Sequence, residues 1–570
     1  MSVRSERQAD GEGRSTAPAW ISASLEVNEG RDPLGLQTTT QDRLMPVLLP
    51  GILELSRRAR YFSFHAFLLA EYRDRRRQAD AKSLSAFIKR REWEFGLAVQ
   101  RCPRGCGSSP VGARRLGGLA QGPGPFTRGE SVESAFGGYG LYYRSPMVEL
   151  GVVAKAGTLL GGQPIPIDVL HDSDRASRLA STFKAAIEGT AYYKRAMWTA
   201  DDLTADVIDE YAEVACLCRL RELVDERDAV HDALFGTDPP AAGLVVGIDS
   251  ETGEPSDADD RSSERAALSD AGALQRRRSV GHYLALVEGD PKVVASQAAY
   301  REGLWSPPQP RSAGHALVAG QWAALIAKDV WQEAVCSVWS EFCRAGLART
   351  RDLGRGLTWD ETRELAAGLI EGPPALDPAT RTDALAAELV AESLVVADSD
   401  DDEVNVALAP MDSLRRLTRR CDSATSGLVV LLELARRMEG RSGIGWEQAA
   451  HVASGWQPSI AAVAAGLRTH LGEDPAVTDT LWWLTSRFVI PVHERIAYSK
   501  LPEFTFRFRW EDGLLRFYDH GMGRFPLAAI RNEPLASLTW DLGLWDRTDD
   551  EDPAGMLTAR GVAFTAEALA

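Results

Sequence analysis

Apolar side chains recur at helical spacing in the first part of the chain. Between residues 41 and 104, positions such as Phe62, Phe67 and Leu68 lie among arginines at steps of three and four, a period typical of amphipathic helices. A Pro-Gly step at residues 50 and 51 breaks the first stretch near its start. The stretch SLSAFIKRREWEFGLAVQRC repeats the pattern, so the sequence predicts two amphipathic, basic helices.

The middle of the chain is more strongly helical. Large apolar residues between Trp322 and Phe342 recur at three- and four-residue steps on more than one face, which is typical of a helix inside a core. A further helical block covers residues 377–495 and is interrupted by the acidic run DSDDDE at 398–403. Residues 196–236 are also expected to form an acidic helical segment, and the polar stretch at 247–264 has the composition of a linker.

Near the C-terminus the pattern alternates instead. In FTFRFRWEDGLLRFYD, residues 504–519, apolar and polar positions alternate on each side of the Asp512-Gly513 step. That dipeptide is a strong turn signal between strands, and it predicts a β-hairpin.

Two distant stretches share one plan. Residues 142–187 and 532–569 each contain a short helix ending in Leu-Gly, an apolar strand, a turn, a second short strand and a final helix. This order resembles the end of a winged-helix domain, where a two-stranded wing follows the recognition helix. We therefore expect a mainly α (α+β) fold, namely a multidomain helical protein with winged-helix-like segments and a C-terminal β-hairpin.

A chain of 570 residues is long enough for several domains. The patterns predict five segments: a flexible N-terminal segment (1–40), a basic helical lobe ending in a winged-helix-like unit (41–195), an acidic helix and linker (196–274), a helical core domain (275–495), and a C-terminal hairpin with a second winged-helix-like unit (496–570). The polar N-terminus lacks the apolar core of a signal peptide, and no apolar run is long enough to span a bilayer. A cytoplasmic protein that does not enter membranes is the expected class.

Charge is distributed unevenly along the chain. The net charge is −17, yet residues 51–130 hold 16 Lys and Arg against 7 Asp and Glu. Such a basic lobe is a candidate surface for the phosphates of DNA or RNA. The candidate nucleic-acid-binding residues are Arg57, Arg58, Arg73, Arg75, Arg76, Arg77, Lys89, Arg90, Arg91, Arg114 and Arg115.

The seven cysteines are irregularly spaced and do not suggest a disulfide framework. Cys102 and Cys106, in RCPRGCGSSPVGARRLGG, look like half of a zinc ribbon, but no second local pair follows them in the same unit. Cys216 and Cys218 are two residues apart on an expected helix, where their side chains would diverge. The sequence therefore predicts free thiols and no metal site.

Other chemistry is not indicated by any motif. The chain has no GxxxxGK[ST] phosphate loop and no GxSxG elbow, and its acidic runs lack the glycine spacing of a calcium loop. We expect no cofactor and assign no catalytic residue.

Segments such as LLPGILELSRRARYFSFHAFLL and FVIPVHERIAYSKLPEFTFRFRWEDG resemble those of large, uncharacterised helical bacterial proteins from mobile or phage-defence gene neighbourhoods. The resemblance implies a role in bacterial anti-phage defence. The leading hypothesis is a non-enzymatic binding or assembly component whose basic lobe contacts nucleic acid. Two alternatives stay open: a protein-interaction scaffold that meets partner proteins encoded nearby, and a nuclease-type enzyme with a dispersed site.

Overall fold

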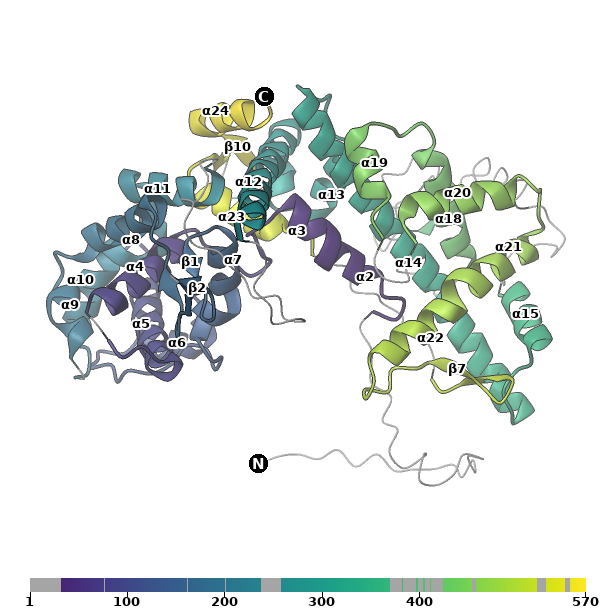
Figure 1. Cartoon of the computed structure of the whole chain (residues 1–570), viewed down its shortest axis with the longest axis horizontal. Coiled ribbons are helices and arrows are strands. Elements are labelled where there is room, and N and C mark those ends of the chain that lie inside the picture. The colour runs from purple at the N-terminus through teal and green to yellow at the C-terminus, as the bar shows by residue number, and fades with distance from the viewer. Residues whose placement is uncertain are drawn as a thin grey trace. The chain divides into compact units, whose positions relative to one another are not determined.

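A computed structural model of the whole chain (Figure 1) describes residues 32–75, 77–160, 162–199, 201–236, 258–369, 424–453, 458–519, 529–548 and 554–570, with a few isolated positions from 382 to 411. Of residues 258–271 only the backbone is described. The protein is mainly helical, as the sequence predicts. Within the described ranges, every helix is too short or too polar to cross a membrane.

Contacts divide the chain into two compact units. Unit 1 comprises Met1–Gln37, Asp329–Glu439 and Ala453–Leu527, and unit 2 comprises Thr38–Lys328, Gly440–Val452 and Ala528–Ala570. This division groups segments that are distant in the sequence, so it does not test the five consecutive segments expected above, which stay a prediction.

Unit 2 is built around helices that carry the basic stretch. Helix α4 packs against α8, α11 and α5, while α5 in turn packs against α10 and α6; these helices lie together in Figure 1. Their bounds are α4 (Arg60–Asp74), α5 (Ala81–Gln100), α6 (Ala113–Ala120), α8 (Asp174–Ile187), α9 (Ala191–Lys194), α10 (Ala205–Ala215) and α11 (Val224–Phe235). The apolar residues singled out in the sequence lie in this core, since Phe62, Phe67 and Leu68 are almost fully buried.

Local signals set the ends of these helices. Asp80 caps α5 by accepting a hydrogen bond from the Ser83 N–H over 2.9 Å. Helix α5 ends just before Cys102 and Pro103, because a proline disfavours helical geometry in the residue that precedes it, here Cys102. Helix α10 ends at Ala215, and Cys216 after it has an extended backbone (φ −55°, ψ 143°). Residues 196–236 are mainly helical, as expected, but they form several short helices and not one: η3 (Ala196–Trp198), α10, η4 (Leu217–Arg221) and α11.

The remaining elements of unit 2 include two similar helix–strand–strand–helix segments. In the first, α7 (Arg144–Glu149) precedes β1 (Val153–Ala154) and β4 (Val169–Leu170), which pair antiparallel, and α8 follows. In the second, α23 (Asn532–Asp541) precedes β9 (Trp545–Arg547) and β10 (Gly555–Leu557), which also pair antiparallel, and α24 (Ala559–Ala568) follows. The glycines after the first helices, Gly151 and Gly543, have φ of 68° and 69°, so both helices end in the left-handed turn that glycine permits.

The other helices and strands of unit 2 complete its core. Helix α12 packs against α24 and β10. The elements are η1 (Thr39–Leu44), α3 (Met45–Leu48), η2 (Tyr139–Tyr143), β2 (Leu159–Leu160), β3 (Gln163–Pro164), α12 (Ala258–Gly289), η5 (Pro291–Val294), α13 (Gln297–Trp305) and α19 (Ile444–Ala450). Helix α14 (Ala313–Leu353) belongs to both units, with the division between Lys328 and Asp329.

Unit 1 surrounds the second half of α14, where Trp339 and Phe342 are fully buried. Strands β7 (Phe508–Glu511) and β8 (Leu514–Phe517) pair antiparallel around Asp512 and Gly513, both of which have positive φ. The further elements are α15 (Trp359–Ala367), β5 (Val396–Ala397), β6 (Glu403–Val404), α18 (Ala424–Met438), α20 (Ile460–Leu471), α21 (Val477–Leu484), η6 (Thr485–Val489) and α22 (Ile490–Ser499). The short α2 (Leu36–Thr38) lies at the division between the units. Most of the acidic run at 398–403 lies outside the described residues.

Candidate metal centre

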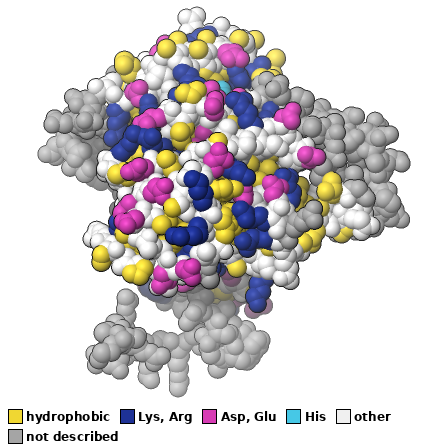
Figure 2. Space-filling model, turned by 90° about the vertical axis from the view of Figure 1, so that its left-hand side faces the viewer, with side chains coloured by type: hydrophobic (Ala, Val, Ile, Leu, Met, Phe, Trp, Pro, Cys, Tyr) yellow, Lys and Arg dark blue, Asp and Glu magenta, His cyan; other side chains and the backbone are white. Residues whose placement is uncertain are grey.

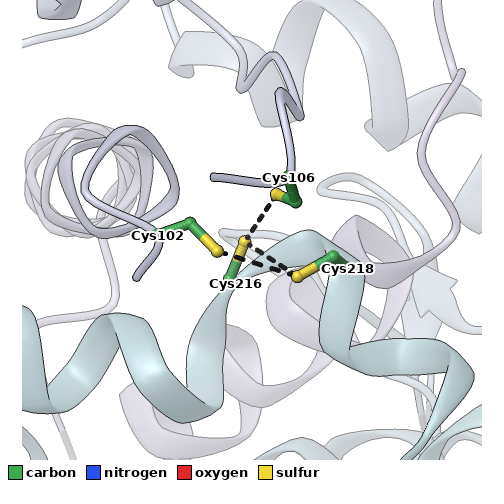
Figure 3. A group of neighbouring side chains, drawn as sticks. All are labelled: Cys102, Cys106, Cys216 and Cys218. Carbon is green, nitrogen blue, oxygen red and sulfur yellow. Dashed lines mark hydrogen bonds between the residues drawn. The ribbon is translucent and has the colours of Figure 1, made fainter. Parts of the chain in front are cut away.

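Four cysteines of unit 2 meet at the ends of two helices. Cys102 follows the C-terminal end of α5, and Cys106 lies four residues later in the loop. Cys216 is the C-terminal cap of α10, and Cys218 lies in η4. Figure 3 shows the four side chains pointing toward one another. Because α5 and α10 pack together, two cysteine pairs more than a hundred residues apart in the chain become neighbours.

The four sulfur atoms are close enough to bind one ion. All four Sγ atoms lie within 4.8 Å of one another. The Sγ of Cys102 lies 3.8 Å from that of Cys218, and the Sγ of Cys216 lies 3.5 Å from those of Cys106 and Cys218. Four sulfurs placed at tetrahedral corners about 2.3 Å from one zinc ion lie about 3.8 Å from each other. The observed spacing therefore corresponds to a mononuclear tetrahedral site.

Other uses of four cysteines fit this spacing less well. A disulfide joins its sulfurs at about 2.05 Å, and all four cysteines are unpaired in this sense. In an iron–sulfur cluster, several irons and sulfides separate the cysteine ligands, so its thiolates lie farther apart than ligands on a single ion. Among the described residues, no other group of His, Cys, Asp or Glu side chains converges in this way.

A tight turn arranges the first cysteine pair. The N–H of Gly105 donates to the carbonyl of Cys102 over 3.1 Å, and Gly105 and Gly107 have φ of 57° and 65°. Glycine adopts this left-handed backbone without strain. The turn directs the backbone N–H groups of Arg104 and Cys106 at the sulfur of Cys102. Such N–H groups stabilise a thiolate, so the turn suits a metal ligand as well as a thiol.

The acidities of the thiols differ strongly within the group. The hydrogen bond with Cys216 is the main reason why the pKa of Cys218 falls to about 5, and the nearby charge of Arg104 lowers it further, against the opposing effect of burial. The same hydrogen bond and burial raise the pKa of Cys216. Burial raises the pKa of Cys102. The crowded sulfurs share protons. Because metal ligands must be thiolates, a bound cation would displace these protons.

Arg60 fixes the position of Cys216. Its guanidinium is completely buried and forms an ion pair with Glu226 at 2.8 Å. It also donates to the carbonyl oxygens of Val214 and Cys216, at 2.8 and 2.6 Å. The bond to Val214 satisfies a carbonyl group that the end of α10 leaves without a helical partner, and the carbonyl of Cys216 also accepts the N–H of Arg219 over 2.9 Å. The backbone that carries Cys216 is thus held by a buried charge pair.

Further arginines surround the four sulfurs. Arg101 donates two hydrogen bonds to Asp209 of α10, at 2.6 and 2.7 Å, which joins the end of α5 to the middle of α10. Arg104 pairs with Glu222 and lies near Cys102 and Cys218. Arg58 lies near Cys106. A zinc ion with four thiolates carries a net charge of −2, and nearby guanidinium groups stabilise such an anionic centre.

The structure pairs most of the predicted nucleic-acid-binding residues with carboxylates. Arg58 forms two hydrogen bonds with the buried Asp541, and Arg91 pairs with the fully buried Glu94. The predicted residues found in ion pairs are Arg57, Arg58, Arg73, Arg75, Lys89, Arg90, Arg91 and Arg115. Arg77 and Arg114 form no ion pair with the described residues, and Arg76 lies outside them. On the face drawn in Figure 2, Lys and Arg lie in several groups with Asp and Glu between them.

Comparison of the chain with known protein families, with curated proteins and with solved structures finds no match in any of the three. Its function is therefore inferred from the residues of unit 2.

Proposed function

We propose that this chain is a zinc-binding protein, and that one Zn²⁺ held by Cys102, Cys106, Cys216 and Cys218 has a structural role. The observation that carries the proposal is the convergence of the four Sγ atoms within 4.8 Å of one another. The thiolate donor set favours zinc among the common divalent ions, because soft sulfur ligands in tetrahedral geometry suit it.

A structural role follows from the donor set. Catalytic zinc sites have three protein ligands and keep one position open for water or substrate, whereas structural sites are closed by four. Here the chain itself supplies four thiolates. The ion would cross-link Cys102 to Cys218, which are 116 residues apart, and so hold the end of α5 against the end of α10. This supports a non-enzymatic role for this centre.

Cobalt substitution tests the proposal. The full chain is purified, its metal is exchanged for Co²⁺, and the absorption spectrum is recorded. Four thiolates on a tetrahedral Co²⁺ give strong sulfur-to-metal charge-transfer bands and intense visible bands. Cys218→Ala should weaken or abolish both. The matched variant Cys343→Ala, which removes a buried cysteine of α14, should leave them unchanged. Equal spectra for the two variants would refute the site.

A second candidate function is contact between the basic lobe and nucleic acid, as part of a binding or assembly component. One observation supports it: the end of α4 and the segment of α9 and η3 carry exposed arginines and lysines beside an aromatic ring, with Arg75 stacked 3.3 Å from the centroid of the Trp198 ring. Retention of labelled DNA or RNA by the purified chain, abolished when the salt concentration is raised, is the expected result.

The two helix–strand–strand–helix segments are proposed to be winged-helix-like units. The first helix of the second segment, α23, is poorly placed to enter a DNA groove, because the side chains of Asn532, Leu535, Leu538 and Asp541 are buried within unit 2. We propose instead that both segments serve packing and protein contacts. This keeps the protein-interaction scaffold, with partners encoded nearby, as an alternative to nucleic-acid contact. Copurification of such partners after nuclease treatment would favour the scaffold.

A role in anti-phage defence is proposed from the sequence resemblance alone. It predicts that deletion of the gene raises the plating efficiency of phages on the host. The nuclease alternative requires carboxylates converging with a lysine, and incubation of the purified chain with Mg²⁺ and labelled DNA tests it.

A further inference from the structure

We propose that single-stranded nucleic acid binds to the surface formed by Arg75, Arg77, Lys194, Arg195 and Trp198, which we call the α4–α9 surface. The inference rests on the nucleic-acid contact proposed above and specifies its place and its ligand. Arg75 and Arg77 follow the C-terminal end of α4, and the other three residues belong to the segment that contains α9 and η3.

Cations and an aromatic ring lie against each other on this surface. The guanidinium carbon of Arg75 lies 3.3 Å from the centroid of the Trp198 ring, and that of Arg77 lies 5.9 Å from it. Arg77 also lies 4.9 Å from the centroid of Phe87. Planar guanidinium groups on indole rings are flat, charged surfaces on which a nucleobase can stack.

Three of the four cations of this surface have no carboxylate partner among the described residues, while Arg75 pairs with Glu71. Arg77, Lys194 and Arg195 are exposed and form no ion pair within the described part of the chain. Partial burial and the charges of Arg91, Arg75 and Arg90 lower the pKa of Arg77. Because crowded like charges favour a bound anion, these cations would stabilise a phosphate at this position.

Two carboxylates near this surface are each shared among several cations. Glu71 binds both Arg75 and Lys184. Glu94, which is fully buried, pairs with Arg90, Arg91 and Arg128. These pairs hold the cations in place and leave an excess of positive charge at the exposed positions.

The segment that carries Trp198 is held rigidly. Arg128 donates to the carbonyl of Thr199 over 2.6 Å and also to that of Ala196, and Arg90 donates to Thr199 over 3.1 Å. The indole N–H of Trp198 donates to the carbonyl of Tyr193 over 2.6 Å. Because the ring is already oriented, a base that stacks there does not bear the entropic cost of ordering it.

The chemistry favours single strands over duplexes. In a duplex the bases are stacked on each other, and only the phosphates are offered to a flat aromatic surface. Single strands offer both phosphates for the exposed cations and base faces for the indole and guanidinium planes. An acidic peptide would engage the cations but would form no specific interaction with Trp198.

Fluorescence anisotropy of the full chain with a labelled 20-nucleotide single strand, the matching duplex and an acidic peptide tests this inference. We expect the single strand to bind most tightly. Arg77→Glu combined with Arg195→Glu should weaken binding tenfold or more and reduce the salt slope by about 0.7 for each phosphate that the variant no longer neutralises. Trp198→Ala should weaken binding, and Trp198→Phe should restore most of it.

Arg468→Glu is the matched control, since Arg468 is exposed on α20 and lies outside both the basic lobe and the α4–α9 surface; this variant should bind normally. Unchanged circular dichroism shows that each variant is folded. Tighter binding of the duplex, or equally weakened binding in Arg468→Glu and the double variant, would overturn the α4–α9 surface while leaving nucleic-acid contact in place. Binding of the peptide alone would overturn both, as would the absence of any binding at low salt.

Discussion

The buried guanidinium of Arg60 donates a 2.6 Å hydrogen bond to the carbonyl oxygen of Cys216 while it pairs with Glu226. This hydrogen bond connects a charge pair in the core with the backbone of a proposed metal ligand. Groups that orient metal ligands are typically worth about 10–100-fold in metal affinity. The pair therefore has two separable roles, in stability and in metal binding.

Arg60→Met should separate these roles. It leaves the buried Glu226 carboxylate without a cation, although the Ser63 hydroxyl still donates to it, and losing one partner of a buried ion pair costs about 3–5 kcal/mol of unfolding free energy. Arg60→Met with Glu226→Leu removes both charges and should recover most of that stability. Zinc affinity, measured by competition with a chromophoric chelator, should stay reduced in both variants, because both lack the donor to Cys216. Full recovery of zinc affinity in the double variant would show that Arg60 acts on stability alone.

The ion pair between Arg58 and Asp541 should contribute much more to the unfolding free energy than the exposed pair between Arg57 and Glu533. Asp541 is 2% exposed and also accepts the N–H of Ala59 over 2.9 Å. Asp541→Asn should therefore lower the unfolding free energy by about 3–5 kcal/mol. The control is Glu533→Gln, which breaks the exposed pair with Arg57 and should cost about 0–1 kcal/mol.

Urea titration followed by circular dichroism measures both variants. Similar decreases in the unfolding free energy for the two would mean that the burial of the Asp541 pair does not determine its contribution.

His493 is buried and neutral in the folded chain, and it should make unit 1 less stable at low pH. The Nε2 of His493 accepts the N–H of Arg507 over 2.9 Å, and its Nδ1 lies 3.1 Å from the carbonyl oxygen of Pro33. One ring nitrogen must therefore be unprotonated, and burial lowers the pKa of His493 to about 3. The unfolded chain binds a proton near pH 6.5, so this contribution is complete above that pH and is lost as the pH falls toward 3.

The change His493→Gln keeps an acceptor for Arg507 and removes the titrating group. We expect the variant to be less stable than the natural chain at pH 7.5, with a difference that shrinks by up to about 1.4 kcal/mol per pH unit below pH 6.5. Tryptophan fluorescence in urea at several pH values measures this, with exposed His451→Gln as control. A difference independent of pH would contradict the assignment of His493 as the acid-sensitive group.

Sequence patterns predict the helices well because their signals are local. The apolar steps around Phe62 and Phe67 and those between Trp322 and Phe342 correspond to α4 and α14. The spacing of apolar residues does not predict the end of α10, because it continues beyond Ala215. The helix ends there because the backbone of Cys216 is extended.

The cluster of four cysteines escapes the sequence pattern for the same reason. Once Cys216 and Cys218 are assumed to lie on a helix, their side chains diverge, and no second pair is available to Cys102 and Cys106. A structural zinc site does not require its two pairs to be close in the sequence. The remaining signal is the Cys-Pro-Arg-Gly-Cys-Gly turn together with a second close pair of cysteines.

The basic lobe is visible in the sequence as charge, but the carboxylates that pair with it are not. Glu226 and Asp541 come from distant segments, and spacing along the chain does not identify them because packing between helices brings them together. Glu94 differs, since it follows Arg90 and Arg91 by four and three residues on α5, a spacing at which helical side chains meet.

Native mass spectrometry of the full chain tests the central claim most directly. We predict one zinc ion bound per chain for the natural protein and for Cys343→Ala, and none for Cys216→Ala with Cys218→Ala. The metal-free protein should also be cut by protease between α5 and α6 faster than the zinc-bound protein. A natural chain that has its cysteines reduced and binds no zinc when the ion is supplied, or a double variant that keeps it, would contradict the four-cysteine zinc centre.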